Sequence, residues 1–579
     1  MLFVCGIALN AAPALPTVQK ISQPDGSIIR VILKGDEYAN FLETVDGYVL
    51  KQSFDGYYRY VYLDDDSLKV SEVVVHDINQ RTTPEIEFLN LIDRKNVKGK
   101  IISLANKRKN IRENSPGVIN KVFPTTGDVK GLVVLAEFKD VRFSSEANAS
   151  LYNDFMNKKD YDGPYASGSV YDYFYDQSHG QLRLDFDVVG PVTLPENRAF
   201  YGSAKETGSE NVSAMIIDAV RLAKEMQPEL DFSGYDKNND GEVDFIYVIY
   251  AGHGEAQGGP EESVWPQASS LQYISWDLYD GLYLGSYACS CELNGKAGEI
   301  LDGIGTFCHE FGHILGLPDL YDTGYSGFNG MGYWDVMDVG SYNNKSKTPA
   351  GYSAFEKYSL GWIDPKCLKH EPDNLDLQPG ESVFLISEHD KNEYFLFENR
   401  QPDRWDVELP GHGMLVSRIK YDRVLWNSNR VNTSSSGFEH VKLIAANNNP
   451  GLNDSGNLFP GSMNKTSFTD YSNPSMSWNS GARVGKPLTD IFLSEQGVLS
   501  FAFMGGKESL TDNLIYSDLK VCQNGEQICI ENAGKMNIAL YTLNGIQIYS
   551  SSEELINIGL KKGVYLIKTR NGAQKLMVK

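Results

Sequence analysis

The sequence predicts a multidomain protein in which one α/β (α+β) domain is flanked on both sides by β-rich segments. With 579 residues, the chain is too long to fold around a single hydrophobic core. Buried-strand runs alternate with helical periodicity in the middle of the chain. Toward both ends, short apolar runs are separated by turn residues, which is typical of antiparallel sheets.

The α/β domain is expected at residues 116–365. Residues 211–226 carry apolar side chains at helical spacing, and residues 131–138 (GLVVLAEF) form an apolar run typical of a buried strand. The elements expected here are strands at 131–138, 182–189 and 245–250, and helices at 169–177, 211–226, 302–316 and 350–360. Asp302 is the candidate N-cap of the helix at 302–316.

Two segments precede this domain. Residues 1–14 are apolar and small, as in a secretory signal peptide. Residues 15–115 read as strands between turns and are expected to be a β-rich propeptide. The charged stretch Lys107–Gly117, at the boundary with the α/β domain, is poor in apolar residues and therefore expected to be an exposed linker. Exposed basic linkers are convenient cleavage sites, so we expect the propeptide to be removed there.

Two further β-rich segments follow. Residues 366–508 show almost no helical periodicity and are expected to form a β-sandwich. Residues 509–579 contain two hairpin patterns, with turns at Asn544–Gly545 and Asn571–Gly572, and are expected to form a small C-terminal β-sandwich.

Charge and composition exclude several classes of partner. Lys plus Arg number 53 and Asp plus Glu number 76, so the net charge is −23. Such an acidic chain is unsuited to nucleic acid or an anionic membrane surface. After the first 14 residues, no apolar run approaches the roughly 18 residues of a transmembrane helix. The seven cysteines include no C-x-x-C pair, which argues against a separate cysteine zinc site.

The motif H-E-x-x-H-x-x-G-x-x-D at residues 309–319 is the most informative part of the chain. Residues four apart lie on one helix face, so His309 and His313 can bind one Zn²⁺ ion. Glu310 between them is the candidate general base for a water molecule at the metal. Gly316 is expected to end the helix and let the chain reverse.

The third metal ligand has two candidates. Asp319 needs only the turn at Gly316 to return to the histidines. Glu356, on the expected helix at 350–360, is the alternative, and would be the third ligand of a gluzincin-type site. The fourth position stays open to water, which is characteristic of catalytic rather than structural zinc.

Two further features accompany the motif. Met337 lies in a loop after it, where a methionine turn could pack beneath the metal ligands. Tyr342 and Tyr352 are candidates for stabilising a tetrahedral intermediate through their phenol groups.

Residues 236–244 match the first nine positions of an EF-hand calcium loop. The twelfth position is Tyr247 rather than a bidentate glutamate, and a strand follows instead of a helix. The pattern therefore predicts either an abbreviated Ca²⁺ loop or an acidic turn without metal, and we favour calcium. The expected ligands are Asp236, Asn238, Asp240, Asp244 and the carbonyl of Glu242.

The chain resembles the immune inhibitor A family of secreted zinc metallopeptidases. The resemblance is carried by residues 306–322, 168–182, 334–337 and 360–362, and covers roughly 120–365. It implies a metzincin-like zinc peptidase made as a zymogen, with zinc on His309, His313 and Asp319, and it favours calcium at 236–244. This sequence departs from commoner metzincins, because it has an aspartate at the position of the third ligand where they carry a histidine.

Residues 538–549, 562–568 and 575–579 resemble a type IX secretion sorting domain. This implies that secretion machinery of a Gram-negative cell exports the protein to the cell surface or the medium. The leading hypothesis is therefore a secreted zinc endopeptidase that acts on extracellular proteins or peptides. A surface adhesin, in which the zinc helix is only a scaffold, is the alternative from another class.

Overall fold

A computed structural model of the chain divides into two compact units, residues 1–505 and 506–579. It describes residues 10–578 except 12, 16, 36–39, 54, 65–66, 102–122, 145–146, 203–209, 272–274, 276, 325–326, 434–436, 452–453, 507–518, 525–526, 533–534, 544 and 570–571. The linker expected at 107–117 and most of the signal segment lie outside the described residues.

The first part of the chain is a six-stranded antiparallel meander in which each strand pairs with the next. Alternate residues of β3, such as Ile29 and Val31, are buried against α1, which Thr82 and Glu85 cap reciprocally. The elements are β2 (Val18–Ser22), β3 (Ile28–Gly35), β4 (Asn40–Thr44), β5 (Val49–Gln52), β6 (Tyr58–Asp64), β7 (Ser67–Val74) and α1 (Thr83–Leu89).

A six-stranded sheet of order β1-β12-β14-β11-β8-β9 organises the central part. β9, β8, β11 and β14 are parallel neighbours, whereas β12 and then β1 add antiparallel to the edge of β14. The strands are β8 (Gly127–Glu137), β9 (Leu182–Thr193), β11 (Ile246–His253), β12 (Gln267–Ser270), β14 (Ser286–Leu293) and β1 (Asn10–Ala11), the last from the N-terminus.

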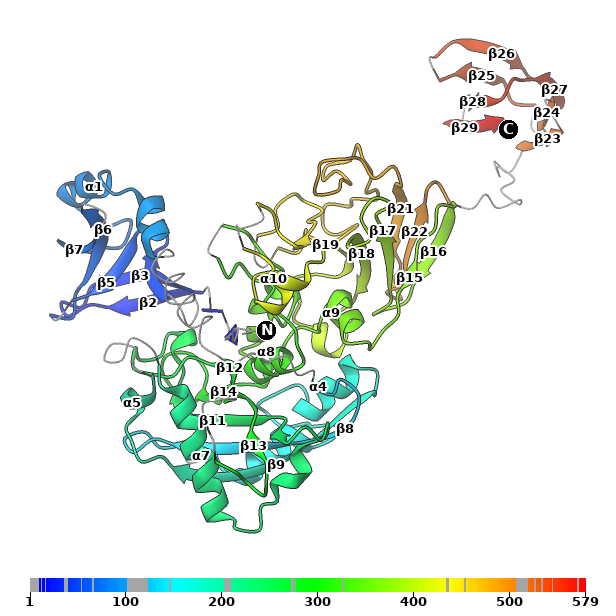
Figure 1. The fold of residues 1–579 in the computed structure, drawn as a ribbon. Helices are drawn as coiled ribbons and strands as arrows, with labels where there is room; N and C mark the ends of the chain where they lie inside the picture. Colours follow the sequence, from blue (N-terminus) through cyan, green and yellow to red (C-terminus); the bar gives the residue numbers. More distant parts are fainter. Residues whose placement is uncertain are drawn as a thin grey trace, which may run out of the picture. The chain divides into compact units, whose positions relative to one another are not determined.

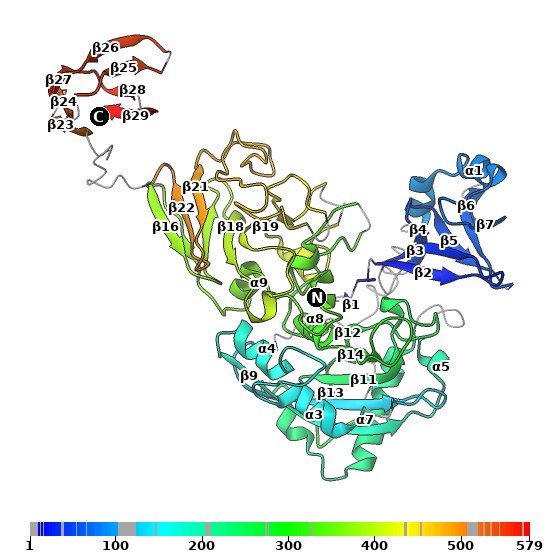
Figure 2. The ribbon, with the colours of Figure 1, turned by 180° about the vertical axis from the view of Figure 1, so that it is seen from behind.

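Both faces of this sheet are covered, which explains the continuous apolar runs in its strands. Val133 and Leu135 of β8 face one core, and Leu132, Val134 and Ala136 face the other. α7 (Val212–Met226) fills the second core, and α3 (Ala149–Asn157), α4 (Val170–Gln177) and α8 (Gly305–Ile314) fill the first. Figures 1 and 2 show the sheet with helices on its two faces.

The helices begin and end close to the expected positions, with two corrections. The N-cap of α8 is Ile304 rather than Asp302, whose buried carboxylate instead accepts a hydrogen bond from Thr306 Oγ1 at 2.8 Å. The helix that carries Glu356 is α9 (Ala354–Ser359), shorter than the expected 350–360. Ser353, whose own backbone is extended, is its N-cap, and residues 349–352 have no regular secondary structure.

Two sheets follow, of orders β15-β17-β18-β19-β20 and β16-β22-β21. Side chains from both, such as Phe397 and Phe501, share one core. The other face of the larger sheet, including Leu396 and Leu415, packs into the core that contains α8. The strands are β15 (Lys366–Cys367), β16 (Asp373–Leu377), β17 (Ser382–Ile386), β18 (Glu393–Arg400), β19 (Gly413–Lys420), β20 (Val441–Leu443), β21 (Leu488–Leu493) and β22 (Leu499–Phe503).

The unit 506–579 has its own core between a three-stranded and a four-stranded sheet. The two hairpins expected here are confirmed, because β25 pairs with β26 and β28 with β29. The strands are β23 (Leu519–Asn524), β24 (Gln527–Asn532), β25 (Ile538–Thr542), β26 (Gln547–Ser551), β27 (Leu555–Gly559), β28 (Gly563–Thr569) and β29 (Gly572–Val578). Among the described helices of the whole chain, none has the length and apolar character needed to cross a membrane.

Candidate active site

α8 places His309 and His313 one turn apart on the same face. Their Nδ1 atoms hydrogen-bond backbone carbonyls, His309 with Val336 O and His313 with Leu317 O, both at 2.8 Å. A carbonyl only accepts, so each Nδ1 carries a proton, and in the neutral imidazole Nε2 is the atom that presents a lone pair. This is the tautomer that metal-binding histidines need.

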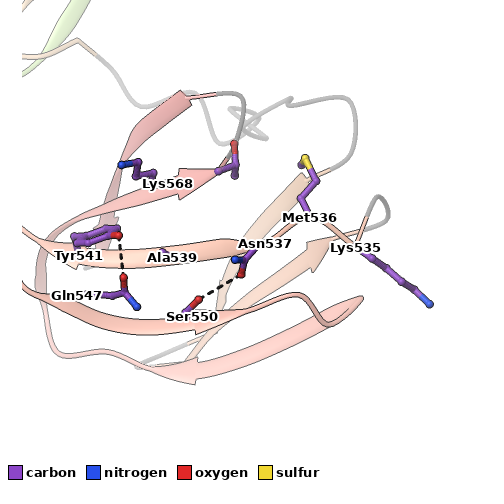
Figure 3. Close-up of a pocket in the computed structure, with 9 residues that line it drawn as sticks. Lys535, Met536, Asn537, Ala539, Tyr541, Gln547, Ser550 and Lys568 are labelled. Carbon is purple, nitrogen blue, oxygen red and sulfur yellow. Dashed lines mark hydrogen bonds between the residues drawn. The ribbon is translucent and has the colours of Figure 1, made fainter.

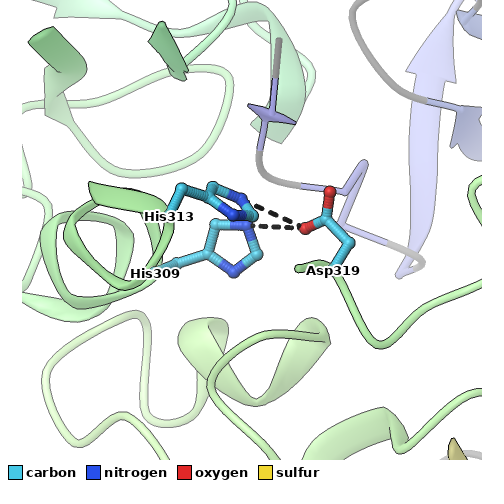
Figure 4. A group of neighbouring side chains, drawn as sticks. All are labelled: His309, His313 and Asp319. Atoms are coloured by element: carbon cyan, nitrogen blue, oxygen red, sulfur yellow. Dashed lines mark ion pairs between the residues drawn. The ribbon is translucent and has the colours of Figure 1, made fainter. Parts of the chain in front are cut away.

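Asp319 reaches the two imidazoles through the turn predicted at Gly316, which has φ +94°. Its Oδ1 lies 3.2 Å from His309 Nε2 and 3.3 Å from His313 Nε2 (Figure 4). All three side chains are at most 1% exposed, yet these converging atoms make no hydrogen bond of good geometry. Buried polar atoms are normally hydrogen-bonded, so this convergence fits a metal ion.

The electrostatics of the cluster favour a cation at this point. Burial favours a neutral imidazole, but the facing carboxylates of Asp319 and Glu310 outweigh it and raise the pKa of His309 to about 9. Burial also opposes charge on Asp319, yet the two imidazoles outweigh it and lower its pKa well below the usual range. A bound metal ion would replace the proton that His309 otherwise holds.

Met337 packs directly against α8, the helix that carries both histidines. A Cβ added at Gly312, between the two histidines, would lie 2.4 Å from Met337 Sδ, so only glycine admits this contact. Asp335 Oδ1 accepts from Met337 N–H at 2.8 Å, and Leu320 N–H donates to Met337 O at 2.9 Å. The loop therefore ties the histidine helix to the Asp319 segment, which supports the methionine-turn interpretation.

The remaining candidates separate into different environments. Glu310 is fully buried on α8 between the histidines. Tyr342 donates its phenol to Pro13 O at 2.7 Å, in the segment that follows β1. Tyr352 donates to Cys308 O at 2.7 Å, inside the core beneath α8. Burial raises the pKa of both phenols, so both remain protonated donors.

The predicted calcium loop does not assemble a comparable cluster. Asp236 accepts from the backbone N–H groups of Asp240 and Gly241, and Asn238 accepts from Asp240 N–H. Asp244 Oδ2 accepts from Lys237 N–H. Within the described residues, His309, His313 and Asp319 are the one group of three or more His, Cys, Asp or Glu whose ligand atoms converge. Calcium at 236–244 therefore stays a prediction.

An open hollow of about 680 Å³ lies in the unit 506–579 (Figure 3). Its lining contains no histidine, cysteine or carboxylate, so it offers no metal-binding cluster. The residues are Lys535, Met536, Asn537, Ala539, Tyr541, Gln547, Ser550, Lys568 and Thr569.

One residue at the site, Asn429, was not predicted from the sequence. Asn429, which follows the short helix α10 (Arg423–Asn427), hydrogen-bonds Asp319 across 110 positions of sequence. No local pattern marks it, because its partner is defined only by the packing of the later sheets against the α8 loop.

A helix with two histidines four apart, a glutamate between them and an aspartate returned by the next turn define a metallopeptidase site. Residues 127–363 match the profile of the immune inhibitor A peptidase M6 catalytic domain. Residues 127–363 therefore carry a domain that matches this metallopeptidase family, as the sequence resemblance predicted.

Two curated proteins are similar to this chain in sequence. The chain is 28% identical over 278 residues to "Immune inhibitor A" of Bacillus thuringiensis subsp. alesti, which covers 40% of each chain. It is 24% identical over 326 residues to "Pre-pro-metalloprotease PrtV" of Vibrio cholerae serotype O1, covering 48% of this chain and 34% of the relative. The matched regions thus span less than half the length of these relatives.

Proposed function

We propose that this chain is a zinc-dependent endopeptidase that hydrolyses peptide bonds of extracellular proteins. The observation that carries the proposal is the convergence of His309 Nε2, His313 Nε2 and Asp319 Oδ1 on one buried point. Two neutral imidazoles and one carboxylate suit zinc and leave a fourth position for reactants. The name of one relative, "Pre-pro-metalloprotease PrtV", and the matching peptidase M6 profile support the same class.

Each residue has a defined task in this proposal. Zinc, when bound, would polarise the scissile carbonyl and acidify the attacking water. The Glu310 carboxylate takes the proton of that water and delivers it to the leaving amine. The Val336 and Leu317 carbonyls hold the imidazoles in orientation. Tyr342 donates to a peptide carbonyl, as it does to Pro13 in the full-length chain.

A chelator experiment tests the zinc dependence. The processed protein is expected to hydrolyse casein, to fall to background after treatment with a strong zinc chelator, and to recover when Zn²⁺ is restored. Mg²⁺ should not restore it, because imidazole ligands suit zinc rather than magnesium. Hydrolysis that survives complete zinc removal would contradict the proposal, and a protein that only binds casein would point to the adhesin alternative.

The zymogen part of the proposal rests on the N-terminal segment. β1 pairs antiparallel with the edge strand β12, with Asn10 opposite Ala268 and Ala11 opposite Gln267. Leu15 N–H then donates to Ala256 O at 3.1 Å. Extended peptides commonly bind by adding a strand to an exposed edge. β1 and Pro13 lie within the expected signal peptide, so they occupy this edge and hold the Tyr342 phenol only in a chain that still carries residues 1–14. The expected propeptide itself contributes the contact of Leu15 with Ala256.

Limited proteolysis tests this latency. The full-length chain is expected to hydrolyse casein at background level and to become active after a trypsin-like cut within 107–117. Alanine in place of Lys107, Arg108, Lys109 and Arg112 is the control and should keep the chain inactive under the same treatment. N-terminal sequencing of the active protein should then start after the linker, whereas a start near Ala12 would refute latency.

We also propose that the protein is exported from the cell. The compact unit 506–579 supports a C-terminal sorting domain, because it folds around its own core. A secreted location and contact with secretion machinery rest on the sequence resemblance of that unit.

A further inference from the structure

The loop that carries Asp319 is held by a segment from the later β-sheet region. Trp426 Nε1 donates to Gly316 O at 2.9 Å, at the turn that ends the metal helix. Asn432 Nδ2 donates to Leu320 O at 2.8 Å, immediately after Asp319. In both contacts a side-chain N–H donates to a backbone carbonyl of the loop, so they fix the path of the loop without touching the carboxylate of Asp319.

Asn429 is different, because it bonds both the backbone and the carboxylate of Asp319. Asp319 N–H donates to Asn429 Oδ1 at 2.6 Å, and Asn429 Nδ2 donates to Asp319 Oδ2 at 2.5 Å. A backbone N–H only donates, so the orientation of the amide is determined by chemistry rather than assigned. Asn429 is 5% exposed and Asp319 is fully buried, so water does not compete readily for these bonds.

The consequence is that the two oxygens of Asp319 become unequal. Oδ2 is bound to the amide of Asn429, whereas Oδ1 faces both imidazoles at 3.2 and 3.3 Å. The carboxylate is therefore presented to the metal position through one oxygen. Without the amide, rotation about χ2 could present either oxygen or both, because this terminal torsion is soft.

The position also requires this residue type. Asn429 has φ +52°, in the left-handed region that asparagine tolerates better than most residues. The neighbouring bonds Arg430 N–H to Leu425 O and Thr323 Oγ1 to Asn429 O hold the turn in place. An aspartate here would fit the backbone but could not donate to Asp319, and it would set two carboxylates face to face.

We propose that Asn429 is a positioning residue for the metal ligand Asp319, selecting Oδ1 as its single metal-binding oxygen. The sheet region after residue 366 is then part of the metal centre rather than an appended domain. The inference rests on the zinc site of the proposed function. Partners that orient metal ligands typically contribute 10- to 100-fold in metal affinity or activity, roughly the effect expected here.

The test compares Asn429→Asp and Asn429→Gly with the unmodified full-length chain. The first replaces the donor with an acceptor, and the second removes the amide while keeping a residue that accepts φ +52°. Zinc affinity is measured by competition with a chromophoric chelator, and ligand geometry by the visible bands of the Co²⁺ form. Asn448→Asp is the matched control, since Asn448 is exposed and also left-handed, at φ +58°.

Both Asn429 variants are expected to bind zinc about 10- to 100-fold more weakly and to change the Co²⁺ spectrum, whereas Asn448→Asp matches the parent. If Asn429→Asp does not fold, Asn429→Gly carries the test. Zinc affinity and Co²⁺ bands equal to the parent's in folded Asn429→Gly would overturn the inference, even if its melting temperature fell. A parent chain that binds no zinc would instead refute the proposed function.

Discussion

Replacing Glu310 with glutamine should lower peptide hydrolysis by about 10²- to 10⁴-fold, the range that a positioned general base contributes. Glutamine keeps the size of the side chain but has no carboxylate to accept the proton of the attacking water. Glu310 is fully buried on α8, and the proposed zinc ligands are His309, His313 and Asp319. The zinc content and the melting temperature should therefore stay close to those of the parent.

The measurement is kcat and KM on a casein-derived peptide, together with zinc per chain, in the processed protein. Glu299→Gln is the control, because it removes one negative charge at an exposed position shortly before α8. It should leave kcat/KM nearly unchanged. Parent-like hydrolysis by zinc-loaded Glu310→Gln would remove Glu310 from its proposed role.

Asp319→Ala should lose zinc, while Glu356→Gln should keep it. Asp319 Oδ1 faces both Nε2 atoms at 3.2 and 3.3 Å. Glu356 Oε2 instead accepts from Ser353 N–H and Ser353 Oγ–H, both at 2.8 Å, as the reciprocal cap of α9. Burial, reinforced by Asp335, raises the pKa of Glu356 well above its usual value and so favours its neutral form, a poor metal ligand.

For both variants, the zinc content per chain is measured after gel filtration, and the zinc affinity is measured by competition with a chelator. The loss of zinc affinity in Asp319→Ala should exceed roughly 100-fold, which is the upper end of the effect of residues that only orient a metal ligand. Glutamine at 356 retains an acceptor for Ser353, so it serves as the control that spares the cap of α9. Loss of zinc from Glu356→Gln with retention in Asp319→Ala would favour the gluzincin alternative.

Several features of this site were accessible from local sequence. The four-residue spacing of His309 and His313 determines a shared helix face, and Gly316 adopts the positive φ that its position required. The structure brings Asp319, rather than Glu356, to the histidines. Asp302 was wrong as N-cap because its carboxylate bonds Thr306 Oγ1, Asn294 and Gln257 instead of the first backbone N–H groups.

Other features depended on packing between distant segments. Tyr342 and Tyr352 were equivalent by spacing, but one donates to Pro13 and the other to the helix carbonyl of Cys308. The place of β1 on the edge of β12 brings together positions more than 250 residues apart in sequence. Sequence periodicity reports only which face of a strand is buried, and not which strand will become its neighbour.

The sequence by itself determined the histidine pair, the glutamate between them and the turn that returns Asp319, because helix and turn geometry depend on nearby residues. Only the tertiary structure decided that Asn429 holds Asp319, that Met337 fills the space left by Gly312, and which tyrosine faces the N-terminal segment. These contacts join residues whose separation along the chain carries no periodic signal. They arise because buried polar groups must find partners and packed side chains must fill the core wherever the fold brings them together.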